Sequence, residues 1–273
     1  MAQAPLGDVL EGSDRRVLAP RPPRIGPRTL RRDRWWLQPL ASAVVLTAFV
    51  GYGTFVAFQG KNYWAAPNYI SPFYSPCIAQ ACGEHANLPI FGDWYRWSPA
   101  LLVLIFPLGF RLTCYYYRKA YYRAFWFSPP ACAVAEPHRT YTGETRFPLI
   151  MQNMHRYFFY FAVIFAGILT WDAIEAFHWP QGWGHMGLGT LVLVINAVLI
   201  WGYTLSCHSC RHLCGGHVDK FSEAPIRYHV WKFVSRLNPY HTQWAWASLV
   251  WIASADLYVR LVAAGALKDP KFF

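Results

Sequence analysis

A short run of cysteines and histidines is the part of this chain best suited to chemistry. The run, in order, is Cys207-His208-Ser209-Cys210-Arg211-His212-Leu213-Cys214-Gly215-Gly216-His217. Thiolate sulfur and imidazole nitrogen together favour zinc, copper or iron–sulfur clusters. The run directly follows residues 184–206, an uncharged segment long enough to cross a bilayer. The sequence therefore predicts a metal centre at one end of a membrane helix.

The composition is typical of a membrane protein. Of the 273 residues, 55% are hydrophobic and only 14% are charged, against about 25% charged residues in ordinary soluble domains. A formal net charge of +11 could indicate nucleic-acid binding, because a basic balance is the usual signature of phosphate contacts. Here the basic residues lie between long apolar runs, so we expect membrane lipid around the chain and no nucleic-acid partner.

Five segments reach, or nearly reach, the roughly 20 apolar residues that a spanning helix needs. They cover about residues 37–58, 97–117, 149–171, 184–206 and 243–264. The second is the weakest, since it contains Pro99, Pro107 and Arg111. We keep it as a span because omitting it would move every later loop to the other side and remove the charge asymmetry described next. The predicted fold is all-α, a bundle of five transmembrane helices over residues 37–267.

The loops predict the orientation of the bundle, because cytoplasmic loops carry an excess of Lys and Arg. Basic residues are concentrated in segments 1–36, 111–146 and 211–236, whereas segment 59–96 contains only two. We therefore expect the N-terminus in the cytoplasm and the C-terminal tail, residues 268–273, outside. Residues 1–36 are predicted to be a Pro/Arg-rich cytoplasmic arm, because their composition cannot form a core.

The cysteines outside the run are interpreted by the side on which they lie. Cys77 and Cys82 belong to the outer loop, where a disulfide can persist, and two unpaired cysteines in a packed loop are the equally weighted alternative. Cys114 and Cys132 lie on the cytoplasmic side and are isolated in the sequence. A cluster held by four thiolates would need another well-spaced cysteine, so we do not expect one.

Two further histidines share the predicted membrane level of the run. His155 lies near the start of the third span, and His241 opens the fifth. By the predicted topology both lie at about the depth of Cys207, and polar groups at such depth are functional candidates. If the fourth helix continues for one more turn, Cys207 and Cys210 share a face. We predict these two cysteines and two histidines as metal ligands, with His212 as the first substitute.

Two thiolates and two imidazoles are the ligand set of a Rieske-type [2Fe–2S] cluster. Its potential of about −150 to +300 mV, against about −400 mV for all-cysteine clusters, suits electron delivery to a quinone. A competing assignment takes Cys210-x-His212 and Cys214-x-x-His217 as the two halves of a Rieske box. In soluble Rieske domains these halves come from separate loops, whereas only Leu213 lies between them here.

The neighbours of these residues suggest supporting roles. Arg156 and Tyr157 are the candidate quinone-binding residues. The Arg156 side chain can extend to the lipid headgroups or donate a hydrogen bond to a quinone carbonyl, with equal weight for each. A buried cluster also needs hydrogen bonds to its sulfurs and imidazoles, for which Ser206, Ser209 and Gln243 are candidates.

Two rival interpretations remain open. In the first, His155 and His241 (or His212) are the axial ligands of a b-type haem. In the second, the Cys/His set binds zinc, and the chain is a membrane assembly scaffold with no redox role.

The chain resembles the five-helix, cytochrome b-like membrane anchor of succinate dehydrogenases. The resemblance is to the branch whose anchor is a single polypeptide with a membrane-embedded Rieske-type cluster in place of haem, and it covers about residues 28–265. It rests on Gln152–Tyr160, on Cys207-His208-Ser209-Cys210-Arg211-His212 with Gly215-Gly216, and on Asn238–Gln243.

The resemblance implies a role in a respiratory enzyme complex. Flavoprotein and iron–sulfur subunits would dock on the cytoplasmic face of this chain. Electrons from succinate would pass through the [2Fe–2S] cluster to a membrane quinone, expected to be menaquinone. The chain would be a multi-pass protein of the bacterial inner (plasma) membrane and would have no catalytic residue of its own for succinate.

Overall fold

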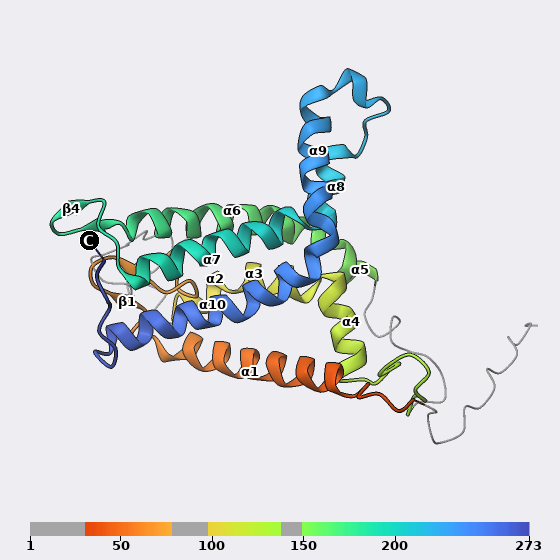
Figure 1. The fold of residues 1–273 in the computed structure, drawn as a ribbon, viewed down its shortest axis with the longest axis horizontal. Coiled ribbons are helices and arrows are strands. Elements are labelled where there is room, and N and C mark those ends of the chain that lie inside the picture. Colours follow the sequence, from red (N-terminus) through yellow and green to blue (C-terminus); the bar gives the residue numbers. More distant parts are fainter. Residues whose placement is uncertain (1–30, 78–97, 138–148, 273) are drawn as a thin grey trace, which may run out of the picture.

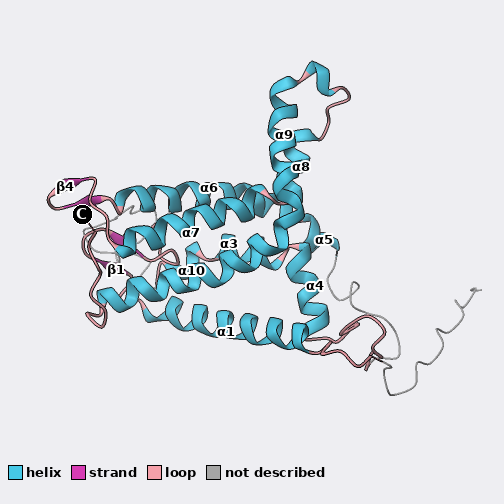
Figure 2. Cartoon of the chain, viewed as in Figure 1, coloured by secondary structure: helices cyan, strands magenta, loops and turns pink. Residues whose placement is uncertain are grey.

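The chain folds into long α-helices that run side by side, with short strand pairs at one end (Figures 1 and 2). The computed structural model describes residues 31–77, 98–137 and 149–272. The helices are α1 (Leu37–Gln59), α2 (Ala100–Val103), α3 (Ile105–Leu112), α4 (Tyr115–Ala124), α5 (Leu149–Asn153), α6 (His155–Glu175), α7 (Leu188–Leu205), α8 (His208–Gly215), α9 (Pro225–Leu237) and α10 (His241–Ala263). Two 3₁₀ turns cover Phe221–Glu223 and Asn238–Tyr240, and the strands are β1 (Trp64–Ala65), β2 (Tyr69–Ile70), β3 (His178–Trp179) and β4 (Gly182–Trp183). Both strand pairs are antiparallel, β1 with β2 and β3 with β4.

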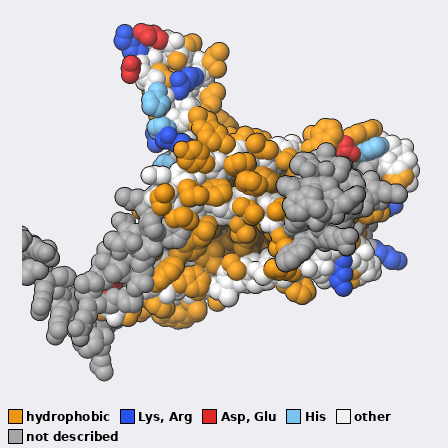
Figure 3. Space-filling model, turned by 180° about the vertical axis from the view of Figure 1, so that it is seen from behind, with side chains coloured by type: hydrophobic (Ala, Val, Ile, Leu, Met, Phe, Trp, Pro, Cys, Tyr) orange, Lys and Arg blue, Asp and Glu red, His pale blue; other side chains and the backbone are white. Residues whose placement is uncertain are grey.

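The bundle has the length and surface of a membrane protein. Helices α1, α6 and α7 and the stretch Pro225–Ala263, which consists of α9, a 3₁₀ turn and α10, are long and apolar enough to span a bilayer. Figure 3 shows hydrophobic side chains over the middle of the bundle and Lys and Arg side chains toward its ends. The prediction of an all-α membrane bundle is confirmed, and the orientation of the termini stays a prediction.

The predicted second span, residues 97–117, is wrong as a single helix. Helices α2 and α3 together cover only residues 100–112, which at 1.5 Å per residue gives about 20 Å. The chain then bends by 77° into α4, which runs across the end of the bundle (Figure 1). Cys114 at this corner has an extended backbone (φ −66°, ψ 131°). The corner therefore places Cys114 at the end of the bundle rather than inside a straight helix.

A loop from the opposite end fills the space that the short helix leaves. Residues 71–77 lie in the loop that we expected to be outside, yet Phe73 and Tyr74 are buried in a core cluster to which α1, α6, α7 and α10 also contribute side chains. Irregular backbone at such depth is tolerated only when protein encloses it. Cys77, at the end of this segment, is buried and disulfide-bonded, and Cys82 lies outside the described residues.

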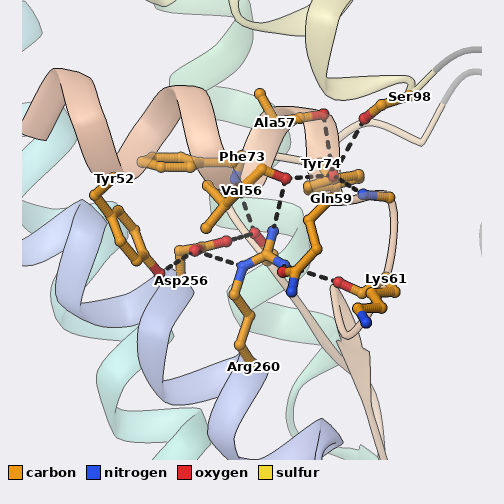
Figure 4. A network of polar contacts seen from close by, with 12 residues as sticks. Tyr52, Val56, Ala57, Gln59, Lys61, Phe73, Tyr74, Ser98, Asp256 and Arg260 are labelled. Carbon is orange, nitrogen blue, oxygen red and sulfur yellow. Dashed lines mark hydrogen bonds and ion pairs between the residues drawn. The ribbon is translucent and has the colours of Figure 1, made fainter.

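A buried ion pair holds this loop to the bundle (Figure 4). Asp256 of α10 is 0% exposed, and its carboxylate accepts hydrogen bonds from the hydroxyls of Ser71 and Tyr52 and from Nε of Arg260, the last at 2.8 Å. Arg260 also donates to the side-chain oxygen of Gln59 at 2.8 Å. The pair therefore connects α10 to α1 and to the inserted loop.

At the other end, α8 and α9 form a hairpin that projects sideways, away from the long helices (Figure 1). The 3₁₀ turn Asn238–Tyr240 links α9 to α10 and contains Pro239, which lacks the N–H of a regular helical bond. The hairpin and α4 thus leave the bundle at the same end.

We expect Asp256→Asn to destabilise the protein by about 3–5 kcal/mol, because Arg260 would remain as a buried charge without its partner. The double variant Asp256→Asn/Arg260→Gln should lose less, since it leaves no uncompensated charge. Thermal unfolding in detergent measures both, with the exposed Lys268→Gln as control. Equal losses in the single and double variants would show that the charge pairing is not what stabilises this end.

Candidate metal centre

A buried cluster of sulfur, imidazole and aromatic groups occupies the end of the bundle where α4, α8 and α9 depart. Cys114, Cys207 and Cys210 are buried in one core cluster together with Phe110 and Tyr203. The elements that meet there are the α3–α4 corner, the start of α6, the end of α7 and the start of α10. Within this cluster, two histidine–cysteine pairs are built in the same way.

The first pair joins His155 to Cys207. The Nε2 atom of His155 lies 3.1 Å from the Cys207 sulfur, and Nδ1 lies 2.9 Å from the Thr113 hydroxyl. That hydroxyl donates its hydrogen to the Gly109 carbonyl at 2.7 Å, so its oxygen accepts from Nδ1–H. The hydrogen-bond network thereby assigns the tautomer whose Nε2 lone pair faces the sulfur. The Phe110 ring stacks on the imidazole with centroids 4.6 Å apart.

The second pair joins His241 to Cys114. Nε2 of His241 lies 3.6 Å from the Cys114 sulfur, and Nδ1 lies 2.7 Å from the Ser206 hydroxyl. The Ser206 hydroxyl donates to the Tyr203 carbonyl at 3.1 Å, which again leaves its oxygen to accept from Nδ1–H. The Tyr203 ring stacks on the imidazole at 5.1 Å. Each pair therefore has a ring held at Nδ1 and an Nε2 lone pair directed at a thiol.

The two pairs form one site. The Phe110 and Tyr203 rings, each stacked on one histidine, contact each other with centroids 5.1 Å apart. Cys114 and Cys207 belong to the same buried core cluster as these two rings. The two thiols and the two stacked imidazoles therefore lie together at this end of the bundle.

The structure corrects the expected continuation of the fourth helix. Helix α7 ends at Leu205, and Cys207 has an extended backbone (φ −65°, ψ 143°) that begins α8. The Cys207 sulfur accepts a hydrogen bond from the Ser209 N–H at 3.3 Å, as an N-cap residue does. Cys207 and Cys210 consequently do not project from one helix face. Cys210 is 5% exposed, and its thiol contacts that of Cys214.

The structure separates the remaining members of the run from these pairs. His212 is exposed, and its ring lies 5.7 Å from that of His217. His208 is also exposed and stacks on Tyr116 at 6.3 Å. Among the described residues, no three His, Cys, Asp or Glu side chains gather closely enough to surround one ion.

Sequence reasoning missed Cys114 and the two residues that orient the first histidine, Thr113 and Phe110. Cys114 was set aside because it is isolated in the sequence. It lies, however, near the end of the predicted second span, at the same membrane level as His155 and His241. We chose the two histidines because they lie at the predicted membrane level of Cys207, and Cys114 meets the same criterion. Of the weaker candidates, Ser206 and Ser209 do contact the pairs.

Arg111 lies beside the second pair. In the sequence it stood out only as a charge that interrupts the second predicted span. Its guanidinium donates to the Tyr117 hydroxyl at 2.7 Å and to the Ser248 hydroxyl at 3.0 Å. It also lies over the Tyr203 ring, 4.7 Å from the centroid. Arg111 therefore ties the α3–α4 corner to α10 and holds Tyr203 against His241.

The two candidate quinone-binding residues border an open cavity beside the first pair. Arg156 and Tyr157, with Asn153 and Ser209, line a space of about 340 Å³ that reaches His155. Both side chains are exposed. The cavity therefore brings a solvent- or lipid-accessible surface to the edge of the partly buried imidazole.

Residues 37–265 match the family described as the actinobacterial succinate dehydrogenase subunit SdhC. The chain belongs to this family. A chain of the solved structure titled "Mycobacterium smegmatis Sdh1 complex in the apo form" is 52% identical, with a TM-score of 0.82 over 93% of this chain and 97% of that chain. No curated protein matches. The resemblance to a succinate dehydrogenase membrane anchor is confirmed, and this SdhC chain is a multi-pass membrane subunit of that enzyme complex.

Proposed function

We propose that this SdhC chain carries electrons from succinate toward a membrane quinone by means of a Rieske-type [2Fe–2S] cluster held at the two histidine–cysteine pairs. The observation that carries the proposal is that two imidazoles and two thiols meet at one buried end of the bundle, with Nε2 of each histidine 3.1 or 3.6 Å from a cysteine sulfur. Two imidazoles and two thiols are the donor set that this cluster requires. When bound, the cluster would accept and release one electron at a potential suited to quinones.

The proposed ligands are His155, His241, Cys207 and Cys114. The sequence-based set contained Cys210 in place of Cys114, and the contact with His241 favours Cys114. Cys210, which is buried in the same core cluster, is the first alternative, and the exposed His212 ranks after it. Thr113 and Ser206 hold the imidazoles by Nδ1, the role that outer hydrogen bonds play for metal-bound histidine.

The rival redox interpretation fits the pairs less well. Axial haem ligation requires two imidazole nitrogens that face the two sides of one macrocycle. Here each Nε2 faces a cysteine sulfur instead, and the rings are packed against Phe110 and Tyr203. A single zinc ion would take four ligands around one point, whereas the described groups are arranged as pairs.

The quinone would bind in the cavity lined by Arg156 and Tyr157. A guanidinium can donate charge-assisted hydrogen bonds to a quinone carbonyl, and the cavity reaches His155, one of the proposed ligands. We expect the quinone to be menaquinone. The His155 ring would then lie between the proposed metal site and the quinone head.

The partners would dock on the end that carries α4 and the α8–α9 hairpin. This end contains the basic segments that predict a cytoplasmic location, and a structural relative of the chain belongs to an Sdh1 complex. We propose that the flavoprotein and iron–sulfur subunits bind there, with the chain in the bacterial plasma membrane. Electrons would then enter on the same side as the two pairs.

The double variant His155→Ala/His241→Ala tests the redox role. We expect it to abolish quinone reduction by the complex, while succinate oxidation by a soluble dye continues, because only the membrane step depends on these imidazoles. His178→Ala, at the opposite end of the bundle and half exposed, serves as control. Intact quinone reduction in the double variant would remove both the cluster and the haem interpretations.

Serine variants of the cysteines test the ligand set. Cys114→Ser and Cys207→Ser should each lose the iron of the membrane subunit, because serine is a poor substitute for a thiolate ligand. Cys210→Ser and the exposed Cys132→Ser should keep it. Iron content and the cluster EPR signal of the purified complex give the answer. Loss with Cys210→Ser and retention with Cys114→Ser would restore the sequence-based set.

Arg156→Gln tests the quinone cavity. Loss of a charge-assisted hydrogen bond of about 1.5 kcal/mol or more should raise KM for quinone by about 10-fold, with dye reduction unchanged. Lys268→Gln, exposed at the opposite end of the bundle, is the control. An unchanged KM together with an unchanged kcat would place the quinone elsewhere.

A further inference from the structure

Helix α9 carries an apolar stripe that the proposed electron path does not use. Ile226, Val230 and Phe233 follow one another at spacings of four and three positions, so they share one face of the helix. They are 80%, 45% and 53% exposed. Leu237, the last residue of α9, continues the stripe toward the bundle. Large apolar side chains gathered on one exposed face indicate a surface that contacts lipid or another protein.

Helix α8 packs against a different face of α9. Arg211 of α8 donates from Nε to the Ser235 hydroxyl at 3.1 Å, and its guanidinium lies 5.3 Å from the centroid of the Trp231 ring. Arg227 of α9 donates to the Gly216 carbonyl at 2.8 Å. Because Arg227, Trp231 and Ser235 are spaced four positions apart, they form a face of their own. The contacts with α8 therefore leave the stripe uncovered.

The remaining face of α9 is polar. Tyr228, Lys232 and Arg236 are spaced four positions apart and are all exposed. An exposed apolar face with large side chains, combined with a basic polar face, is typical of helices that lie in the interface between lipid and water. The pattern of α9 thus favours a membrane surface as its neighbour.

The hairpin of α8 and α9 begins and ends at the level of the bilayer surface. Helix α7 has 18 residues, which cover about 27 Å, close to the roughly 30 Å of the hydrocarbon core. Helix α8 follows its end directly, and α9 leads through a 3₁₀ turn into α10. The long helices cross the membrane, so a hairpin that projects sideways from their ends (Figure 1) runs along the membrane surface.

Figure 3 indicates which way the apolar side of the hairpin faces. In this view its hydrophobic side chains lie on the side turned toward the long helices, and they continue into the apolar surface of the bundle. The histidine and charged side chains lie mainly on the other side and at the tip. A subunit docked on the end of the bundle would meet this second side, whereas the first side faces the hydrocarbon. The direction therefore favours lipid over a docked subunit.

We propose that α9 is an interfacial helix whose stripe of Ile226, Val230 and Phe233 inserts among the acyl chains of the adjacent leaflet. The hairpin would extend the contact of this chain with the membrane beyond the bundle and leave its other side free for a neighbouring subunit. Insertion requires only that the chain lies in a membrane. It is independent of the metal and quinone proposals, so either can fail without the other.

Photo-crosslinking in the purified complex identifies the neighbour of each face. The crosslinking residue p-benzoylphenylalanine replaces Phe233 in one sample and Tyr228, on the polar face, in another. Both positions hold an aromatic ring, so the replacements are matched in shape. After illumination in phosphatidylcholine nanodiscs, mass spectrometry measures the adducts. We expect phospholipid adducts to be about 10-fold more abundant at the first position than at the second.

The other occupants of the stripe are outcomes of the same experiment. An adduct that joins the Phe233 position to another subunit of the complex, or to a second copy of this chain, would overturn the proposal. It would also be overturned if no phospholipid adduct formed at this position, or if both positions gave such adducts equally.

Hydrogen exchange of the α9 amides tests insertion without a crosslinker. In phosphatidylcholine nanodiscs, Val230→Gln/Phe233→Gln should make these amides exchange about 10-fold faster, because a helix that leaves the interface unfolds locally more often. Lys232→Gln/Arg236→Gln, a double change on the polar face, is the matched control and should keep the original rate. Dye reduction by succinate verifies that each complex has assembled. Equal exchange rates in the two variants would contradict insertion.

Discussion

The structure of the end that carries α4 and α8 depends on how the imidazoles of His155 and His241 find hydrogen-bond partners for both ring nitrogens. In an apolar bundle, a histidine nitrogen without a partner is costly, and each ring meets this constraint in the same way. A hydroxyl, from Thr113 or Ser206, accepts from Nδ1–H, and a thiol faces Nε2. The 77° bend after α3 and the break after Leu205 are the backbone features that bring these hydroxyls and thiols to the rings.

The opposite end meets the same constraint by different means. The inserted loop of residues 71–77 brings polar backbone deep into the bundle, and the carboxylate of Asp256 holds it through Ser71. Arg260 neutralises that carboxylate. The two ends therefore use buried polar groups differently. A paired ion network stabilises the end that contains Asp256, whereas the opposite end places cysteine thiols against histidine lone pairs. Polar groups that are paired stabilise a membrane bundle, and those kept available for a ligand give it a function.

The sequence predicted the bundle and the shared depth of His155, Cys207 and His241, because hydropathy and helix length determine depth in a bilayer. It did not predict the corner at Cys114 or the end of α7, since both depend on tertiary contacts. Asp256 and Ser71 are far apart in the chain, so no local pattern connects them. Orientation in the membrane and the metal ligands remain predictions. The sequence predicts how deep each of these residues lies in the membrane. It does not predict which way the side chain points at that depth.

Our central claim is that the two histidine–cysteine pairs hold a Rieske-type cluster. The most direct measurement is the EPR and visible spectrum of the succinate-reduced complex, compared with the same complex carrying Cys207→Ser. We predict a signal with a low average g value and a broad visible spectrum, both lost in the variant. Sharp Soret and α-bands, or zinc in place of iron at this membrane anchor, would contradict the claim.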